Sequence, residues 1–283
     1  MTERICVNWG GLGNRIGPPV SHGKELRSNM KTYFERLPLM RGLRGLFGSP
    51  PVSPPAISLQ DPVVNSHCTE FEVNNWIVSE FVISTLVPIL GVHPFPLNEL
   101  FLMVSAVCRL KPDYIVEWGT HHGKSARIFY ETSKRFGLDV TIHSVDLPDD
   151  TVHQEHPGLQ RGVLVKGLRE VILHQGDGLT VCLEIHNRIG KSDATLVFID
   201  GDHSYASVRR ELNAVMTHMP DANILLHDTF YQSEKSGYNV GPYKAIAEAM
   251  AVAPDRYRRL STDTGLPGMT LLYQLIQPKA SGL

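Results

Sequence analysis

The sequence has no long apolar run and few cysteines. No stretch approaches the ~20 consecutive apolar residues of a membrane-spanning helix, and the residues after Met1 form no apolar core of signal-peptide length. The four cysteines lie far apart and show neither a C-x-x-C pair nor a metal-ligand spacing, which is typical of reduced thiols. We therefore expect a cytoplasmic protein without a membrane partner.

The sequence also lacks a strong excess of either charge. Its formal net charge is -2 and its pI is about 6.7, so the composition does not indicate a nucleic-acid-binding surface. The 283 residues are 42% hydrophobic and 20% charged. This composition is ordinary for a globular protein, and the length is sufficient for one large α/β domain with an extension.

The first 93 residues show the weakest pattern. Residues 48–55 are rich in proline, so they cannot form a helix or a central strand and are predicted to be a connector. Apolar residues between 70 and 90 indicate one or two helices, and residues 97–110 have the spacing of an amphipathic helix. We predict an N-terminal arm or helical extension over 1–93 and a main domain over 94–278. The extension is expected to act as an arm, a lid or a dimer contact, and the protein is expected to form a homo-oligomer.

The stretch 113–125 organises the rest of the chain. Residues 114–116 form a short apolar run that ends at a charged residue and a glycine, which indicates a buried strand. Residues 125–136 carry apolar side chains at helical spacing with charged residues between them. The predicted unit is a strand, a glycine turn and a helix.

The glycines of this turn have a distinct spacing. Gly119 and Gly123 carry no Cβ, so backbone N–H groups at the start of the helix can approach a ligand closely. The pattern is E-x-G-x-x-x-G-x-S, beginning at Glu117 and ending at Ser125. It matches neither the dinucleotide pattern G-x-G-x-x-G nor the phosphate loop G-x-x-x-x-G-K-[ST]. The turn is predicted to form a nucleotide-type pocket, and the alternative is a tight turn without a ligand.

This pattern resembles the first motif of class I methyltransferases that depend on S-adenosylmethionine (SAM). The resemblance implies that the glycine turn lies against the methionine half of SAM and that the acid before it helps to hold the amino end. The cofactor-binding residues implied in this stretch are Glu117, Gly119, Thr120, Gly123 and Ser125.

Two further strands are predicted to bring acids to the same edge of a sheet. Residues 140–146 form a strand that ends in Asp146, and an acid after the second strand of a doubly wound sheet suits ribose hydroxyls. Residues 166–170 are expected to end a helix, and residues 171–175 form a third strand. By resemblance, Asp177 after that strand lies near the adenine amino group; the alternative is a turn acid between two glycines.

Polar clusters follow the fourth and fifth predicted strands. Residues 194–199 are all apolar or β-branched, as expected for a central parallel strand that is buried on both faces. They run into Asp-Gly-Asp-His-Ser-Tyr at 200–205, and no requirement of folding explains so many polar groups there. Residues 223–226 form the fifth strand and end in His-Asp-Thr.

These clusters resemble the branch of class I methyltransferases that includes sugar and antibiotic O-methyltransferases and cephalosporin-hydroxylase-like proteins, over residues 94–275. The resemblance implies a divalent metal held by Asp200 and Asp228, with Asp202 as a further ligand. Mg²⁺ prefers oxygen ligands and needs only one or two carboxylates. His227 stands where a carboxylate is common, and it favours a softer metal or a place outside the ligand shell. The alternative for the acids is capping and hydrogen bonding at strand ends.

The function predicted from these parts is methyl transfer from SAM to a hydroxyl of a small molecule, such as a sugar, a glycoside or a secondary metabolite. His203 is the first candidate for the base because imidazole titrates near neutral pH, and His227 is the second. Asp200 is expected to act in catalysis and to contact the cofactor. His121 and His122 are candidates for lining the methyl site.

Three alternatives remain open for the sequence. The first is N-methylation, which needs no metal. The second is a SAM-binding partner subunit of an oxygenase without transferase activity. The third is a nicotinamide-dependent enzyme, against which the missing G-x-G-x-x-G counts.

The predicted fold is α/β with a Rossmann-like, doubly wound sheet. Residues 206–219 and 241–253 are expected to be helices, and residues 257–260 and 269–275 an antiparallel strand pair. The sheet then has seven strands and is mostly parallel with the last strand antiparallel, and a helical extension precedes it.

Overall fold

The computed structural model describes residues 61–63, 65, 68–151, 157–190 and 194–274. By its internal contacts the chain divides into two units, Met1–Pro55 and Ala56–Leu283. The described residues all belong to the second unit. The predicted Pro-rich connector lies outside them, and the predicted boundary at residue 93 stays a prediction.

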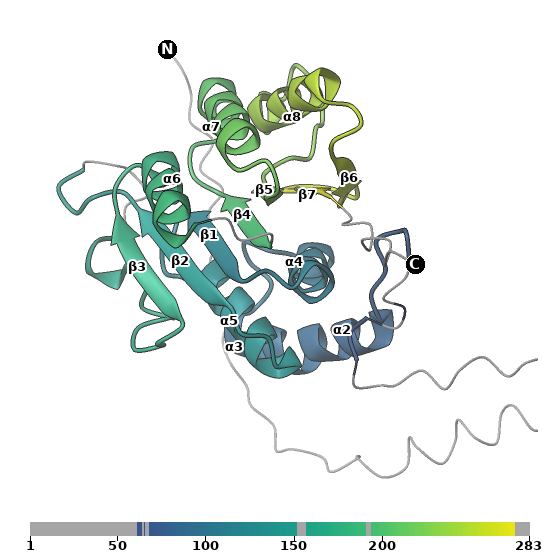
Figure 1. Cartoon of the computed structure of the whole chain (residues 1–283), viewed down its shortest axis with the longest axis vertical. Helices are drawn as coiled ribbons and strands as arrows, with labels where there is room; N and C mark the ends of the chain where they lie inside the picture. Colours follow the sequence, from purple (N-terminus) through teal and green to yellow (C-terminus); the bar gives the residue numbers. More distant parts are fainter. Residues whose placement is uncertain (1–60, 64, 66–67, 152–156, 191–193, 275–283) are drawn as a thin grey trace, which may run out of the picture. The chain divides into compact units, whose positions relative to one another are not determined.

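One seven-stranded sheet forms the centre of the second unit (Figure 1). Its strand order is β3-β2-β1-β4-β5-β7-β6, and only β7 runs antiparallel to both of its neighbours. This arrangement confirms the predicted Rossmann-like sheet with an antiparallel last strand. The strands are β1 (Tyr114–Trp118), β2 (Thr141–Asp146), β3 (Val171–Gln175), β4 (Thr195–Ile199), β5 (Asn223–His227), β6 (Arg258–Ser261) and β7 (Met269–Tyr273).

Helices cover both faces of the sheet. One hydrophobic cluster joins a face of the sheet to α2, η3, α3, α4 and α5, and a second cluster joins the other face to α6, α7 and α8. The helices are α2 (Asn75–Phe81), the π-helical turn η3 (Val82–Leu86), α3 (Val87–Leu90), α4 (Leu97–Leu110), α5 (Lys124–Phe136), α6 (Gly178–Ile189), α7 (Tyr205–His218) and α8 (Val240–Val252).

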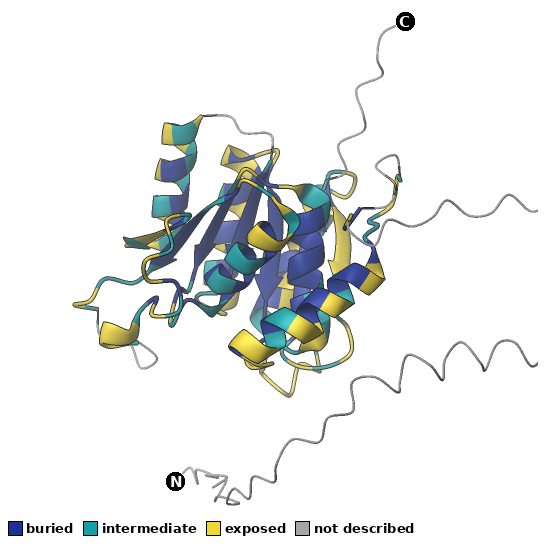
Figure 2. Ribbon diagram, turned by 90° about the horizontal axis from the view of Figure 1, so that it is seen from below, coloured by how far each residue is buried: buried dark blue, intermediate teal, exposed yellow. Residues whose placement is uncertain are grey.

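The central strands are buried between these layers (Figure 2). All five residues of β4 and all five of β5 are buried, as their unbroken apolar runs predict for strands covered on both faces. Neighbouring residues alternate between the two layers: Phe198 packs in the cluster with α4 and α5, and Val197 in the cluster with α7 and α8. The sheet is therefore a rigid base for the residues that follow its strands.

Two elements differ from the sequence expectation. Residues 166–170 do not end a helix; a 3-10 turn, η4 (Gly158–Gln160), is followed by turns. Gly162 and Gly167 have positive φ values of 62° and 85°, which interrupt any helix there. Helix α6, which begins after Asp177, is not among the expected elements, because the two glycines around Asp177 are typical of a turn.

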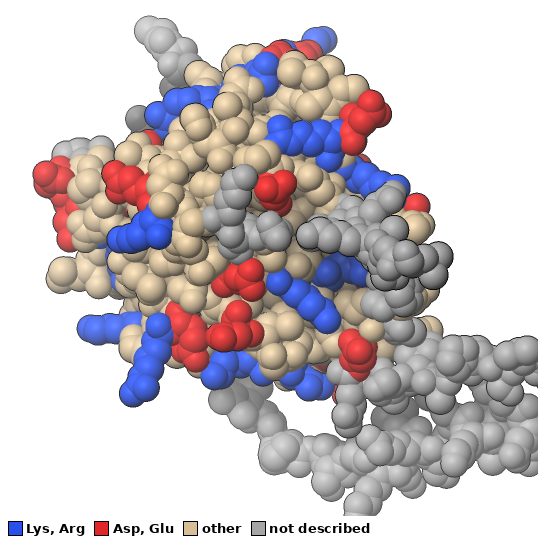
Figure 3. All heavy atoms as spheres, viewed as in Figure 1, with Lys and Arg blue, Asp and Glu red and all other residues tan. Residues whose placement is uncertain are grey.

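The surface carries both charges. On the face seen in Figure 3, Lys and Arg side chains are interspersed with Asp and Glu side chains. Among the residues that the structure describes, no helix has both the length and the apolar character needed to cross a membrane.

Candidate active site

The candidate site lies where the order of the parallel strands reverses. β1 pairs with β2 on one side and with β4 on the other. The chain therefore builds the sheet outwards in one direction from β1 to β3 and in the other direction from β4 onwards. In open α/β sheets, ligands bind beyond the carboxyl ends of the strands at such a point. The glycine turn after β1 and the polar residues after β4 and β5 all belong to this edge.

The glycine turn requires its glycines. Gly119 has φ +96°, and a Cβ placed there would lie 2.0 Å from the carbonyl oxygen of Asp200. Gly123 has φ +84°, and its Cβ would lie 2.9 Å from a methyl carbon of Val165. The turn is thus packed directly against the backbone that follows β4, which brings the predicted cofactor turn and the predicted metal residues together.

Glu117 is a buried acid at the end of β1. It is 1% exposed, and the Ser144 hydroxyl donates to its Oε1 at 2.5 Å. Its Oε2 makes no well-aligned hydrogen bond within the described part of the chain. Burial raises the pKa of Glu117 to about 7, although the hydroxyls of Ser144 and Ser125 act in the opposite direction. Ser125 and the backbone N–H of Ala126 also act on this carboxyl group. Because a carboxylate oxygen can accept more than one hydrogen bond, Glu117 can accept a donor from a ligand beside these contacts.

Thr120 and Ser125 are buried beside this acid. Thr120 is 1% exposed, and its hydroxyl lies 2.7 Å from that of Ser144. Ser125 is 4% exposed, and the hydrogen bond from its side chain favours the ionised form of Glu117. Both residues support Glu117 and its neighbour Ser144 from within the protein.

Asp146 joins the glycine turn to the loop before β3. Its Oδ2 accepts from the backbone N–H of His121 at 2.9 Å, and its Oδ1 from that of Leu147 at 2.8 Å. The guanidinium of Arg161 lies 3.5 Å from Oδ2 and also donates to the carbonyl of Leu147. Asp146 lies at the expected edge, and here it fixes the turn.

Asp177 caps helix α6. Its Oδ1 accepts from the backbone N–H and the hydroxyl of Thr180, at 2.9 and 2.7 Å, and its Oδ2 lies 3.0 Å from Arg210. Burial opposes its ionisation, but the bonds from Thr180 and the charge of Arg210 prevail and lower its pKa. The contacts of Asp177 are therefore those of a capping residue.

Three side chains from the ends of β4 and β5 form a cluster that could hold a metal ion. Ligand atoms of Asp200, His203 and Asp228 all lie within 4.8 Å of one another. His203 Nε2 is 3.2 Å from Asp228 Oδ2, and the Tyr238 hydroxyl donates to Asp228 Oδ1 at 3.1 Å. We call Asp200, His203 and Asp228 the acidic cluster.

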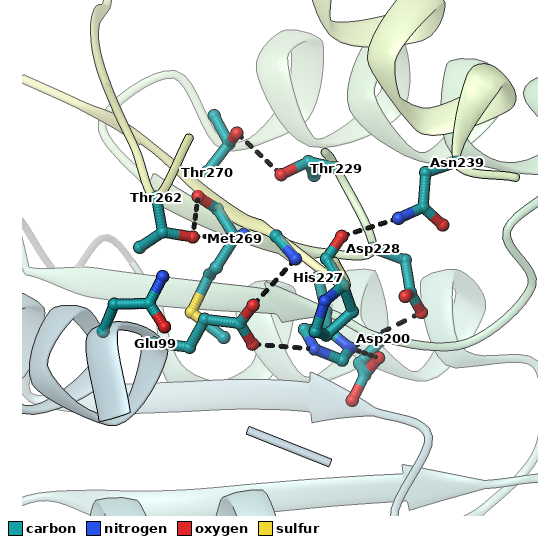
Figure 4. A network of polar contacts seen from close by, with 12 residues as sticks. Glu99, Asp200, His227, Asp228, Thr229, Asn239, Thr262, Met269 and Thr270 are labelled. Atoms are coloured by element: carbon teal, nitrogen blue, oxygen red, sulfur yellow. Dashed lines mark hydrogen bonds and ion pairs between the residues drawn. The ribbon is translucent and has the colours of Figure 1, made fainter. Parts of the chain in front are cut away.

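The buried His227 ring lies between Glu99 and Asp200 of the cluster (Figure 4). Its Nδ1 is 2.9 Å from Asp200 Oδ1, and its Nε2 is 3.0 Å from Glu99 Oε2. Burial alone would lower the pKa of His227, but the charges and hydrogen bonds of Asp200, Glu99 and Asp228 outweigh it and raise the pKa to about 10. With both ring nitrogens engaged and 5% of the residue exposed, His227 is poorly placed to take a proton from a substrate.

Asp202, the third predicted metal ligand, has other contacts. Its Oδ1 accepts from the backbone N–H of Ser204, and its Oδ2 from the hydroxyls of Ser204 and Ser207, at 2.9, 2.9 and 2.5 Å. It thus supports the start of α7, and His203 occupies the third position of the cluster. His121 and His122 pack ring to edge in the glycine turn, and His122 Nε2 lies 2.9 Å from Gln160.

Comparison with protein families identifies the segment that carries this site. Residues 116–229 match a family model described as a methyltransferase domain. This segment is a methyltransferase domain. It includes the residues from Val116, next to Glu117, to Thr229, just past the acidic cluster. Glu99 lies outside it. No curated protein matches the chain significantly by sequence.

Several solved structures resemble the chain. An SAH-bound methyltransferase of Podospora anserina is 14% identical, with 92% of this chain and 100% of that chain covered and a TM-score of 0.46. A putative O-methyltransferase of Klebsiella pneumoniae is 19% identical, with 69% and 89% covered and a TM-score of 0.46. The O-methyltransferase TomG of Streptomyces achromogenes, solved with SAM, is 15% identical, with 69% and 86% covered and a TM-score of 0.45. Because these TM-scores are below 0.5, they decide nothing about the acceptor of the methyltransferase domain.

Proposed function

We propose that this protein transfers a methyl group from SAM to a hydroxyl oxygen of a small molecule. The observation that carries the proposal is the contact between the glycine turn and the acidic cluster: Gly119 packs on the backbone of Asp200 so tightly that no Cβ fits between them. A cofactor on the turn would therefore lie beside side chains that can bind and deprotonate a hydroxyl.

The residues at the turn fit SAM. The amino group of SAM is a cation with N–H donors, and Glu117 offers a buried carboxyl whose Oε2 makes no well-aligned hydrogen bond in the described part of the chain. Asp146 stands at the end of β2, where ribose hydroxyls are commonly held. When bound, SAM supplies a methyl group that its sulfonium already activates.

The acidic cluster is suited to the acceptor side. Asp200 and Asp228 are proposed to hold a divalent cation, which would lower the pKa of a bound hydroxyl. Glu99, Asp200 and Asp228 all lie within ion-pair distance of His227, so acidic side chains outnumber the buried imidazole in this region. His203 is proposed as the base, since its side chain is 44% exposed and its Nε2 is held by Asp228.

The nature of the cation depends on the role of His203. With His203 as the base, the protein ligands are oxygens, which suits Mg²⁺. With His203 as a third ligand, the set of two carboxylates and an imidazole suits Mn²⁺ or Zn²⁺. The metal that restores activity after chelation distinguishes the two assignments.

Transfer is tested with SAM labelled in the methyl group and a panel of sugars, nucleotide sugars, glycosides and phenols. Label is expected in a hydroxyl acceptor, and transfer should be lost with chelator and in Asp228→Asn. Transfer to amines alone would favour N-methylation. SAM binding without transfer to any acceptor would favour the non-catalytic partner of an oxygenase.

A further inference from the structure

Glu99 is a buried acid that lies outside the methyltransferase domain and contacts His227, the neighbour of the acidic cluster. It comes from the first turn of α4 and is 0% exposed. Its Oε1 accepts from the backbone N–H of Gly268 at 2.7 Å, and its Oε2 lies 3.0 Å from His227 Nε2 (Figure 4). One side chain thus connects α4, the start of β7 and the end of β5.

The His227 ring continues this connection to the cluster. Its Nδ1 lies 2.9 Å from Asp200 Oδ1. A carboxylate is only an acceptor, so each ring nitrogen must carry the hydrogen of its bond. Glu99, His227 and Asp200 therefore form a continuous chain of charge-assisted hydrogen bonds, which are stronger and more directional than neutral ones. The Phe95 ring packs edge to face with the imidazole, with 4.8 Å between the two ring centroids, and this contact restricts the His227 ring.

Packing alone does not account for Glu99. Its helix is otherwise lined by apolar residues such as Leu100, Met103 and Val107, which are at most 1% exposed. A buried carboxylate is costly unless it is fully paired, and an apolar side chain would cover the sheet at this position without that cost. Glu99 instead contacts one nitrogen of the His227 ring, and the other nitrogen of that ring contacts Asp200 of the acidic cluster.

We propose that Glu99 is a positioning residue: it fixes the His227 ring, and through it the orientation of the Asp200 carboxylate. Asp200 Oδ1 is then occupied, and Oδ2 is left for the cation or the acceptor. The identity of the group that Asp200 binds rests on the proposed function. The chain of hydrogen bonds from Glu99 through His227 to Asp200 is independent of that function and can be tested on the protein without any ligand.

The test is a double-mutant cycle on the full chain with Glu99→Gln and Asp200→Asn, followed by denaturant unfolding. The two residues act on each other through His227, so their effects on the unfolding equilibrium constant should differ from additivity by at least about threefold, as groups of one network do. In the His227→Gln background the same two changes should be additive. A Glu99 that only packs would give additive effects in both backgrounds, and that result would overturn the proposal.

The second readout is the affinity for Mn²⁺ alone. Glu99→Gln should weaken it by about tenfold, since residues that orient metal ligands typically contribute that much. The matched control is Glu211→Gln, another buried helical acid, 4% exposed, whose side chain contacts Arg210 and Trp118 and none of the cluster residues; it should bind Mn²⁺ as the wild type does. Equal weakening in both variants would contradict a specific role of Glu99. If the wild type binds no Mn²⁺, the proposed cation is wrong, and the cycle still decides the role of Glu99.

Discussion

Glu117 should make SAM binding depend on pH. Its pKa is about 7 because of burial, and only the ionised carboxylate attracts the cationic amino group of SAM. The affinity should therefore increase by about tenfold from pH 6 to pH 8, following the ionised fraction of one group. Calorimetric titration at the two pH values checks this. In Glu117→Gln the affinity should be lower and the same at both pH values; an unchanged pH dependence would exclude Glu117 as the group.

Asp202 and Asp228 should respond differently to the loss of a charge. Asp228 belongs to the acidic cluster, so Asp228→Asn should weaken Mn²⁺ binding by at least about tenfold. Asp202 accepts hydrogen bonds from Ser204 and Ser207 at the start of α7, so Asp202→Asn should leave the affinity within about twofold and reduce stability by about 1 kcal/mol, the typical contribution of a hydrogen bond. Mn²⁺ titration and thermal melting compare the two. Equal losses of Mn²⁺ affinity in the two variants would indicate that Asp202 is a metal ligand.

Sequence patterns identify most of these residues but not their contacts. Asp200 and Asp228 were expected to lie together because parallel strands end at one edge. The contacts of Asp202 at the start of α7 depend on the hydroxyls of Ser204 and Ser207, and the motif does not distinguish this role from that of a metal ligand. Glu99 gave no signal, since an acid in the first turn of a helix is ordinary and its partner His227 is 128 residues away.

At the scale of elements, the glycine turn after β1 determines how closely the proposed SAM site lies to Asp200 and the acidic cluster. Gly119→Ala places a Cβ 2.0 Å from a backbone oxygen, which no change of side chain can relieve. We expect a loss of about 3 kcal/mol or more. The control is Gly137→Ala at the end of α5, with φ +65° and open space around it, which should cost about 1–2 kcal/mol for the left-handed conformation alone. Denaturant unfolding measures both, and equal losses would contradict the tight packing of the turn.

The strands and most helices follow from apolar spacing. Helix α4 has the predicted bounds, Leu97–Leu110, and β3 has the predicted bounds, Val171–Gln175. Helix α6 was missed because its first residue, Gly178, directly follows Gly176 and Asp177, a composition typical of turns. Its signal was present in Asp177 and Thr180, which stand three residues apart as a cap and its partner do.

At the scale of the whole molecule, the doubly wound, mostly parallel sheet could be predicted because alternating strands and helices allow few topologies. The sheet also contains a pair of imidazoles, of which His143 is buried, and this pair should make stability sensitive to acid. His143 Nδ1 on β2 lies 3.0 Å from His174 Nε2 on β3. Burial, together with the charges of His174 and Arg188, lowers the pKa of His143 to about 4.

Below pH 6.5 the unfolded chain protonates His143 while the folded protein does not, so stability is lost as the pH falls from 6.5 towards 4. Between pH 6.5 and 4.5 this group should lower the Tm by roughly 5 °C. Glu117 and Glu211, whose pKa values are raised to about 7, act in the opposite direction. The measurement is therefore the difference from His143→Gln, whose Tm should fall less over the same pH range. Parallel melting curves for the two proteins would show that His143 does not contribute.

The central claim is that the turn and the acidic cluster form one site for SAM and a hydroxyl acceptor. The most direct measurement is calorimetric titration of SAM into the full chain at pH 8, with Mg²⁺ and then with chelator. The account predicts saturable binding to one site per chain under both conditions, weakened at least about tenfold in Glu117→Gln and little changed in Asp228→Asn. No binding under either condition would contradict it and leave the glycine turn as a site for another nucleotide.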